Sequence, residues 1–273
     1  MVAPPTTASC PEDALAFAER LADAAGAVIR PYFRAACPVE QKADRTPVTA
    51  ADREAEQTMR RMIAATYPDH GILGEEYGEE RSDAAFVWVL DPIDGTKSFI
   101  TGVPLFGTLI ALLHDRRPIL GIIDQPVLGE RWIGAIGRPT LFNGAPARTR
   151  SCGDLQAAVL STTGLDQYRG ADADAFARIA GAVGLLRHIT DCYGYAMLAS
   201  GHVDLVVEAG LQPYDHLALT PVVAGAGGII TDWHGRALDL DSDGRVAAAG
   251  DAALHAEVLA LLTAAGRGGS GGR

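Results

Sequence analysis

Apolar side chains recur at helical spacing near the N-terminus of the chain. The recurring positions are Leu15, Phe17, Leu21, Ala25, Val28 and Ile29. Their spacing predicts a helix that begins at a capping-box pattern in residues 9–12 and reaches about residues 30–34, where Pro31 interferes with its continuation. A second capping-box pattern at 49–52 predicts a helix that ends before Pro68.

Shorter apolar runs follow, and their length predicts strands. These runs lie at 86–90, 105–113, 119–124 and 131–136, and residues 114–118 (HDRRP) are typical of a hairpin turn. After the turn-rich segment 138–153 the pattern alternates between strands and helices. It predicts strands at 157–162, near His188, at 204–208 and at 228–233, with helices at 171–183, 193–201, 216–226 and 252–265.

The change of pattern predicts two halves that pack closely together. Residues 9–140 form an α+β half with a largely antiparallel sheet, and residues 141–265 form an α/β half. The tail 266–273 (GRGGSGGR) has the composition of a linker and is predicted to be disordered.

Composition and charge narrow the class of protein. The 273 residues are 48% hydrophobic and 21% charged, which is typical of a globular protein with a large core. The net charge of −11 argues against nucleic acid or an anionic membrane as a partner. The four cysteines show no metal-binding spacing, and no long apolar run or signal-peptide pattern is present, so we expect a cytoplasmic protein.

The segment 88–96 (WVLDPIDGT) carries the strongest chemical signal. A predicted apolar strand ends at Asp91 and Asp94, whose carboxylates can coordinate one hard cation between them. The Ile93 carbonyl is a further oxygen ligand in the same turn. Gly95 and Thr96 then open a short turn or helix whose backbone N–H groups can bind an anion beside the metal. A β-turn with an Asx cap is the alternative, but the complete string favours metal binding.

Other carboxylates support an all-oxygen site, although each also has a structural explanation. Glu75 ends a short apolar run and could belong to a solvated acidic face, while Asp215 precedes an apolar helix and could be its N-cap. Asp52 could serve only as the third residue of its capping box. Taken together, such oxygen-rich acidic groups favour Mg²⁺ over zinc or iron.

Three separated motifs resemble the inositol monophosphatase-like superfamily of Mg²⁺-dependent, lithium-sensitive phosphatases. They are Gly74-Glu75-Glu76, Asp91-Pro-Ile-Asp94-Gly-Thr96, and Tyr214-Asp215 followed by a glycine-rich stretch at 225–228. Their order and spacing also fit, and the resemblance extends from about residue 12 to 265. It implies a layered αβαβα sandwich that combines α+β and α/β organisation, and a homodimer by analogy with relatives.

The resemblance implies a set of metal ligands in this chain. A first Mg²⁺ would be held by Glu75, Asp91 and the Ile93 carbonyl, and a second by Asp91, Asp94 and Asp215. A third, weaker ion would rest on Glu75 and waters. Two to three ions per site are therefore expected, and they would invert the negative field that otherwise repels a phosphate monoester.

The same resemblance implies catalytic and phosphate-binding residues. Thr96 and Asp52 would orient and deprotonate the attacking water, with help from Glu75. The backbone N–H groups of Gly95 and Thr96 would hold the phosphate. Lys42 matches a superfamily lysine near the metal entrance, or is a solvated loop lysine.

Within the superfamily the chain looks most like the histidinol-phosphate phosphatase branch. The segments that carry this likeness are 91–113, 121–134, 191–195 (DCYGY) and 210–215 (GLQPYD), although Thr190 stands where the branch usually has glycine. The implied reaction is hydrolysis of L-histidinol phosphate in histidine biosynthesis. Inositol phosphate or another small monoester is the runner-up, and a silent metal-binding regulator is a remote alternative.

Two further acidic residues bear on the choice of substrate. Glu208 matches the superfamily position that contacts the organic part of the substrate, and Asp191 stands where cyclitol-specific relatives carry a small residue. An acidic pair could receive the ammonium group that histidinol has and inositol lacks. The alternative for Asp191 is an N-cap of the helix predicted at 193–201.

Overall fold

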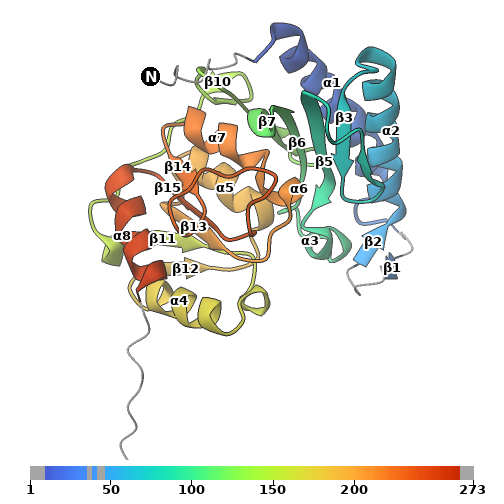
Figure 1. Cartoon of the computed structure of the whole chain (residues 1–273). Helices are drawn as coiled ribbons and strands as arrows, with labels where there is room; N and C mark the ends of the chain where they lie inside the picture. Colours follow the sequence, from blue (N-terminus) through green and yellow to red (C-terminus); the bar gives the residue numbers. More distant parts are fainter. Residues whose placement is uncertain (1–9, 36–38, 42–46, 265–273) are drawn as a thin grey trace, which may run out of the picture.

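Helices and sheets alternate in five layers. The computed structural model describes residues 10–35, 39–41 and 47–264. Two helices cover the outer face of an eight-stranded sheet, three helices lie between that sheet and a five-stranded one, and two more cover the far side (Figure 1). In this order the helices are α1 (Glu12–Ile29) and α2 (Ala50–Thr66); α5 (Asp191–Ala199), α6 (Pro213–His216) and α7 (Leu219–Gly225); α4 (Ala171–Ala180) and α8 (Ala252–Thr263).

The eight-stranded sheet is antiparallel except where β3 meets β5. Its strand order is β10-β9-β8-β7-β6-β5-β3-β4. The strands in chain order are β3 (Gly71–Gly74), β4 (Gly78–Glu80), β5 (Phe86–Asp94), β6 (Gly107–His114), β7 (Arg117–Gln125), β8 (Glu130–Ala135), β9 (Leu141–Phe142) and β10 (Ala145–Pro146). The predicted hairpin turn is confirmed, because Asp115 and Arg116 join β6 to β7 with φ values of 47° and 66°, as a two-residue turn requires.

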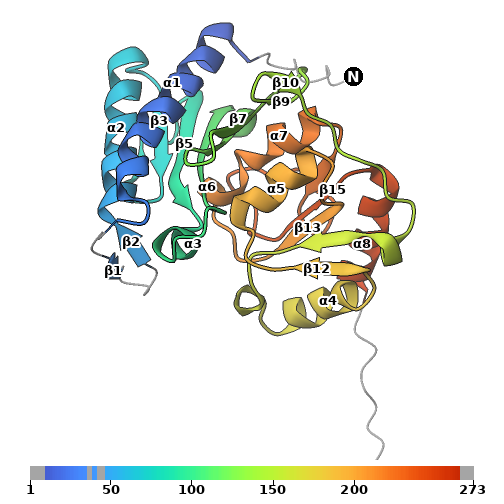
Figure 2. The ribbon, with the colours of Figure 1, turned by 180° about the vertical axis from the view of Figure 1, so that it is seen from behind.

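The five-stranded sheet is mixed and has the order β12-β11-β13-β15-β14. The strands are β11 (Val159–Ser161), β12 (Leu185–Arg187), β13 (Leu205–Glu208), β14 (Ile229–Thr231) and β15 (Val246–Ala249). Figure 2 shows α5 and α7 on the side that faces the first sheet. The remaining elements are the pair β1 (Val39–Gln41) and β2 (Pro47–Thr49), the five-residue helix α3 (Thr96–Ile100), and the 3-10 turns η1 (Arg30–Tyr32), η2 (Leu155–Ala157) and η3 (Leu165–Gln167).

In the described part of the chain, three apolar cores fill the spaces between the layers. Along β5, Trp88 and Leu90 pack under α1 and α2, whereas Val87 and Val89 pack against the middle helices. Because successive side chains of a strand point to opposite faces, a strand covered on both faces must be apolar throughout. This explains the uninterrupted apolar run before Asp91, and the predicted αβαβα layering is confirmed.

The structure corrects two details of the predicted helices. The capping box expected at the start of the first helix is wrong, since α1 begins at Glu12 with Pro11 as its N-cap and no side-chain cap. The helix predicted at 216–226 is divided into α6 and α7. Pro221 has no N–H to donate to the Leu217 carbonyl, which interrupts the helical hydrogen-bond pattern at this point.

The chain passes from one sheet to the other between β10 and β11. The proposed halves 9–140 and 141–265 stay a prediction. The tail 266–273 and Lys42 lie outside the described residues.

Candidate active site

An acidic pocket of about 260 Å³ lies where the two sheets approach each other. It is lined by residues from β5, α3, α5, β13 and the loops that follow β3 and β13. Six of the lining residues are acidic: Glu75, Asp91, Asp94, Asp191, Glu208 and Asp215. The structure therefore brings together carboxylates that lie up to 140 positions apart in sequence, a separation given by residues 75 and 215.

A β-bulge places Asp91 and Asp94 on the same side of the sheet. Asp91 pairs with Leu109 and Asp94 with Gly107, so β5 takes three steps where β6 takes two. Without the extra residue, two positions three apart would point to opposite faces. The Ile93 N–H donates to Asp91 Oδ1 at 3.0 Å and holds that carboxylate in the turn.

Glu75 reaches the same place through the parallel pairing of β3 and β5. Gly74 pairs with Leu90, and the Glu75 N–H donates to the Leu90 carbonyl at 3.1 Å. Both strands therefore end at the same edge, with Glu75 beside Asp91. A supporting residue that the sequence did not reveal is Glu56 of α2, which is fully buried and accepts hydrogen bonds from the N–H groups of Glu76 (2.7 Å) and Tyr77 (3.2 Å).

Asp215 comes from the opposite half of the molecule. It is the third residue of α6 and accepts the Gln212 N–H at 2.7 Å in a capping box. Helix α6 contacts β5, which brings the loop from β13 to the end of that strand (Figure 1). As a result, carboxylate oxygens of Asp91, Asp94 and Asp215 lie within 4.8 Å of one another.

This concentration of negative charge is unfavourable unless it is compensated. Loss of water around Asp91 raises its pKa well above the usual range, and the charges of Glu75, Asp94 and Asp215 raise it further. The pKa of Asp94 is also raised well above its usual range by burial and then by Asp191 and Asp215. A divalent cation with oxygen ligands would remove the repulsion, so the donor set fits such an ion.

The charge of Glu75 acts on Asp52, and only one of the two carboxylate oxygens of Asp52 takes part in helix capping. Its Oδ2 completes the predicted capping box, accepting from the Thr49 N–H at 2.8 Å and from its hydroxyl at 2.6 Å. Its Oδ1 is buried without a hydrogen-bond partner in the described part of the chain. Burial, and to a smaller degree the charge of Glu75, raises the pKa of Asp52 to about 6. Capping therefore accounts for only one of the two carboxylate oxygens.

Gly95 and Thr96 form the turn between β5 and α3. Gly95 adopts a left-handed conformation with a φ of 86°, which glycine tolerates best. The Thr96 hydroxyl donates to the Ile93 carbonyl at 3.2 Å. Both residues line the acidic pocket, so their positions are compatible with the predicted phosphate site.

Asp191 does not cap the helix that follows it. Thr190 is the N-cap of α5, and Asp191 is the first helical residue, with no side-chain bond to the helix. Its Oδ2 instead accepts the hydroxyl of Ser98 at 2.6 Å. The N-cap alternative is therefore wrong, because the carboxylate is engaged by another helix, α3, and lines the pocket.

Glu208 ends β13 deep in the same pocket. One oxygen accepts the N–H (2.9 Å) and the hydroxyl of Thr163, and the other accepts the Tyr195 hydroxyl at 3.0 Å. Burial raises the pKa of Glu208 to about 7 despite these hydrogen bonds, and the charge of Asp191 adds to the increase. Among the described residues, no lysine, arginine or histidine forms an ion pair with Asp191 or Glu208.

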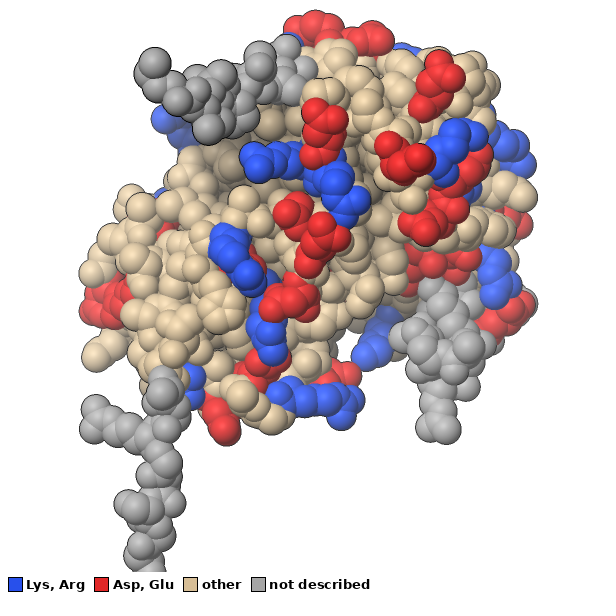
Figure 3. Space-filling model, in the orientation of Figure 1, with Lys and Arg blue, Asp and Glu red and all other residues tan. Residues whose placement is uncertain are grey.

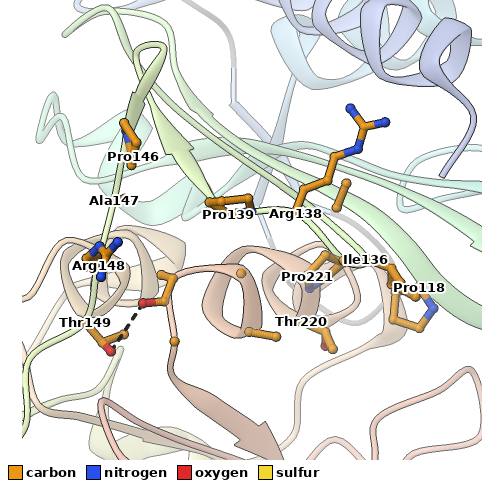
Figure 4. A pocket seen from close by; sticks show the side chains of 16 residues that line it. Pro118, Ile136, Arg138, Pro139, Pro146, Ala147, Arg148, Thr149, Thr220 and Pro221 are labelled. Atoms are coloured by element: carbon orange, nitrogen blue, oxygen red, sulfur yellow. Dashed lines mark hydrogen bonds between the residues drawn. The ribbon is translucent and has the colours of Figure 1, made fainter. Parts of the chain in front are cut away.

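A larger cavity of about 760 Å³ lies between α7 and the segments 135–139 and 146–149 (Figure 4). Its described lining contains Arg138, Arg148, Thr149 and several prolines but no carboxylate, histidine or cysteine. Figure 3 shows basic and acidic side chains interspersed on the face seen there. Among the cavities described here, the acidic pocket is the one that combines potential metal ligands with potential proton acceptors.

Comparison with known proteins identifies the family. The sequence profile of the inositol monophosphatase family matches residues 11–267, which is almost the whole chain. The chain belongs to the inositol monophosphatase family. This family is metal-dependent and hydrolyses small phosphate monoesters, so the chain is a phosphoric monoester hydrolase.

Similar members of the inositol monophosphatase family carry different names. The bifunctional phosphatase IMPL2 of Arabidopsis thaliana is 51% identical over 253 residues, covering 89% of this chain and 72% of that protein. A histidinol-phosphatase of Chlorobaculum parvum is 39% identical over 239 residues, covering 86% and 91%. The structure of an inositol monophosphatase from Zymomonas mobilis matches with a TM-score of 0.87 at 48% identity, covering 94% and 100%.

In the part of this family member that the structure describes, no helix combines the length and apolar character needed to cross a bilayer.

Proposed function

We propose that this phosphatase hydrolyses L-histidinol phosphate to L-histidinol and inorganic phosphate. The observation that carries the proposal is a second acidic pair in the pocket, Asp191 and Glu208, beside the cluster of potential metal ligands. A pocket of this kind suits a substrate with a phosphate at one end and an ammonium group at the other. The similarity to a protein named histidinol-phosphatase supports the same choice.

We assign the metal cluster to Mg²⁺. One ion would be held by Glu75, Asp91 and the Ile93 carbonyl, a second by Asp91, Asp94 and Asp215, and a third, weaker ion by Glu75 and waters. The chemistry supplied by bound Mg²⁺ is neutralisation of the phosphate oxygens, a lower pKa for the attacking water, and stabilisation of the leaving alkoxide.

The residues around the cluster would position the water and move its proton. With a pKa of about 6, Asp52 is a carboxylate at neutral pH. Its Oδ1, which accepts no hydrogen bond from the described residues, would receive a proton of the water, while Thr96 would orient that water. Glu75 would assist, and the N–H groups of Gly95 and Thr96 would donate to the phosphate oxygens. As the water oxygen bonds to phosphorus, its proton would pass to Asp52; the ester P–O bond would break, and the leaving alkoxide would take a proton from solvent water to become the alcohol.

Asp191 and Glu208 would bind the organic part of the substrate. An ammonium group placed between them would form charge-assisted hydrogen bonds and offset the repulsion that raises the pKa of Glu208. Tyr195, which lines the pocket and donates to Glu208, would hold that carboxylate in place. An uncharged polyol gains none of this electrostatic stabilisation.

Hydrolysis of inositol 1-phosphate is the second candidate. It is supported by the similarity to the inositol monophosphatase of Zymomonas mobilis. A silent metal-binding regulator has less support, because Thr96 lines the same pocket as the cluster and the charge of Glu75 acts on Asp52. Homodimer formation and a cytoplasmic location stay predictions.

The decisive experiment measures phosphate release by the purified protein with Mg²⁺. L-Histidinol phosphate, myo-inositol 1-phosphate and a 3′-phosphonucleotide are compared in parallel. We expect L-histidinol phosphate to be preferred by about 100-fold or more in kcat/KM, which corresponds to about 2.7 kcal/mol. Preference for inositol phosphate, or equal rates, would reject the proposed substrate but keep the phosphatase, whereas no turnover of any ester would favour the silent regulator.

A further inference from the structure

The backbone that carries Asp191 is strained. Ile189 and Asp191 have φ values of 63° and 43°, in the left-handed region that residues with a Cβ atom rarely adopt. Such conformations persist only where surrounding contacts hold them, and they cluster at ligand sites. The segment that leads into α5 must therefore be held in this conformation by tertiary contacts with other elements.

Two hydrogen bonds from the other half of the molecule supply that restraint. The Cys192 N–H donates to Asp94 Oδ2 at 2.6 Å, and the Ser98 hydroxyl donates to Asp191 Oδ2 at 2.6 Å. Ser98 and Asp191 are 2% and 8% exposed, so the bond between them is shielded from water. It connects α3 directly to the start of α5.

Gly95 closes the other side of this contact. A Cβ atom at Gly95 would lie 2.8 Å from both Cγ and Oδ2 of Asp191, closer than van der Waals contact allows. The Asp191 carboxylate therefore rests against a residue without a side chain while Ser98 binds one of its oxygens. Its Oδ1 accepts no hydrogen bond from the residues described in the structure, and Asp191 lines the pocket.

The charge of the group that donates to Asp191 affects how well this carboxylate can bind a cationic substrate. Ser98 is neutral, so it fixes the carboxylate without cancelling its charge. The neighbouring cation, Lys97, is 74% exposed at its side chain and pairs with Asp166 at 3.2 Å instead. A lysine or arginine bound directly to Asp191 would compete with a cationic substrate for the same oxygen atoms.

We propose that Ser98 is a positioning residue for substrate selection. It holds Asp191 Oδ2, with Gly95 as the opposing wall, so that Oδ1 stays available to the ammonium group of the substrate. This inference rests on the proposed function, since it assigns the selection of an aminoalkyl phosphate to a contact between α3 and α5. Ser98 acts through Asp191 and touches neither the phosphate nor the metal cluster.

The test compares Ser98→Ala with wild type on two esters, L-histidinol phosphate and myo-inositol 1-phosphate. We expect KM for L-histidinol phosphate to rise by about tenfold with kcat changed less than twofold, and both constants for inositol phosphate to change less than twofold. Thr101→Ala is the matched control: it removes a hydroxyl at the end of α3 that donates only to the backbone carbonyls of Lys97 and Ser98 and leaves the Ser98 side chain intact, so both esters should be unaffected. Equal losses on both esters, or no change on either, would overturn the proposal.

A double-mutant cycle shows whether Ser98 acts through Asp191. In an Asp191→Asn background, we expect Ser98→Ala to change KM for L-histidinol phosphate by less than twofold. A full tenfold effect in that background would contradict the proposal. Ser98→Cys, which keeps the size of the side chain but is a weaker donor, should have an intermediate KM and serves if Ser98→Ala does not fold.

The two proposals fail in different ways. If wild type does not prefer L-histidinol phosphate, the proposed function is wrong, and the Ser98 inference falls with it. If wild type shows the preference but Ser98→Ala keeps it, only the positioning role is wrong.

Discussion

Asp94 illustrates how a carboxylate proposed as a metal ligand can be unfavourable for folding. Its pKa is raised by burial and by the charges of Asp191 and Asp215, and its Oδ2 accepts the Cys192 N–H. An asparagine keeps a carbonyl oxygen for that hydrogen bond and removes the negative charge. The two roles can therefore be separated by a single substitution.

We predict that Asp94→Asn lowers kcat by at least about 100-fold, because it removes a proposed metal ligand. The same variant should unfold at a higher temperature than wild type when divalent cations are chelated, because like-charge repulsion is relieved. Phosphate release and thermal melts in EDTA measure the two effects. An Asp94→Asn protein with wild-type turnover would contradict the metal assignment.

The residues of the site could be predicted to different extents. Asp91 and Asp94 were evident because a string of six residues, DPIDGT, contains both carboxylates and the glycine turn. Asp191 was ambiguous, since an acidic residue before a helix fits an N-cap equally well. Only its contact with Ser98, 93 positions away, separates the two interpretations. Ser98 and Glu56 carry no local signal, because their roles depend entirely on tertiary contacts.

At the scale of elements, α2 supports the loop that carries Glu75. Glu56 accepts the N–H groups of Glu76 and Tyr77, and its Oε1 also pairs with Arg60 at 2.7 Å. Gly74 lies so close that a Cβ atom there would be 2.0 Å from Glu56 Oε1. The helix and the loop therefore form a single rigid unit beside the cluster.

We predict that Glu56→Ala raises the Mg²⁺ concentration needed for half-maximal activity by roughly fivefold. Two partly buried N–H groups lose their acceptor, and Glu75 becomes less well positioned. A Mg²⁺ titration of phosphate release measures the effect. Glu54→Ala, an exposed position on the same helix, is the control and should not change the titration. An unchanged midpoint for Glu56→Ala would show that α2 does not support the metal cluster.

Most elements could be predicted from hydrophobic spacing, whereas the short strands β1, β2, β4, β9 and β10 and the strand β15 could not. Strand β15 was missed because Val246–Ala249 is three-quarters alanine, which has little strand preference, although the strand lies between β13 and β14. The division between α6 and α7 follows from Pro221. In both cases packing between layers outweighs the local preference of the sequence.

At the scale of the whole molecule, the buried carboxylates link stability to pH. Asp52 and Glu208 have pKa values of about 6 and about 7, both above those of the unfolded chain. Between about pH 4 and pH 7 the folded protein therefore binds more protons than the unfolded chain, so these groups make the metal-free protein less stable as pH rises.

We predict that in EDTA the contribution of these carboxylates to Tm falls as pH is raised from 5 to 8, and that Mg²⁺ raises Tm more at pH 8 than at pH 5. Magnesium binds deprotonated carboxylates, so its stabilising effect grows as protons leave. Thermal melts of wild type and Glu208→Gln, with and without Mg²⁺, measure both trends. A Mg²⁺ effect equal at the two pH values would contradict the assignment.

The pocket is assembled from two sheets whose contributions differ in kind. The eight-stranded sheet supplies Glu75, Asp91 and Asp94, most of the groups proposed to act on the phosphate, whereas α5 and β13 supply Asp191 and Glu208, proposed to contact the alcohol. Mutations on the second side can alter which alcohol is accepted while the reaction stays the same. In evolution, such a chain can therefore change its substrate specificity while the residues that act on the phosphate ester stay the same.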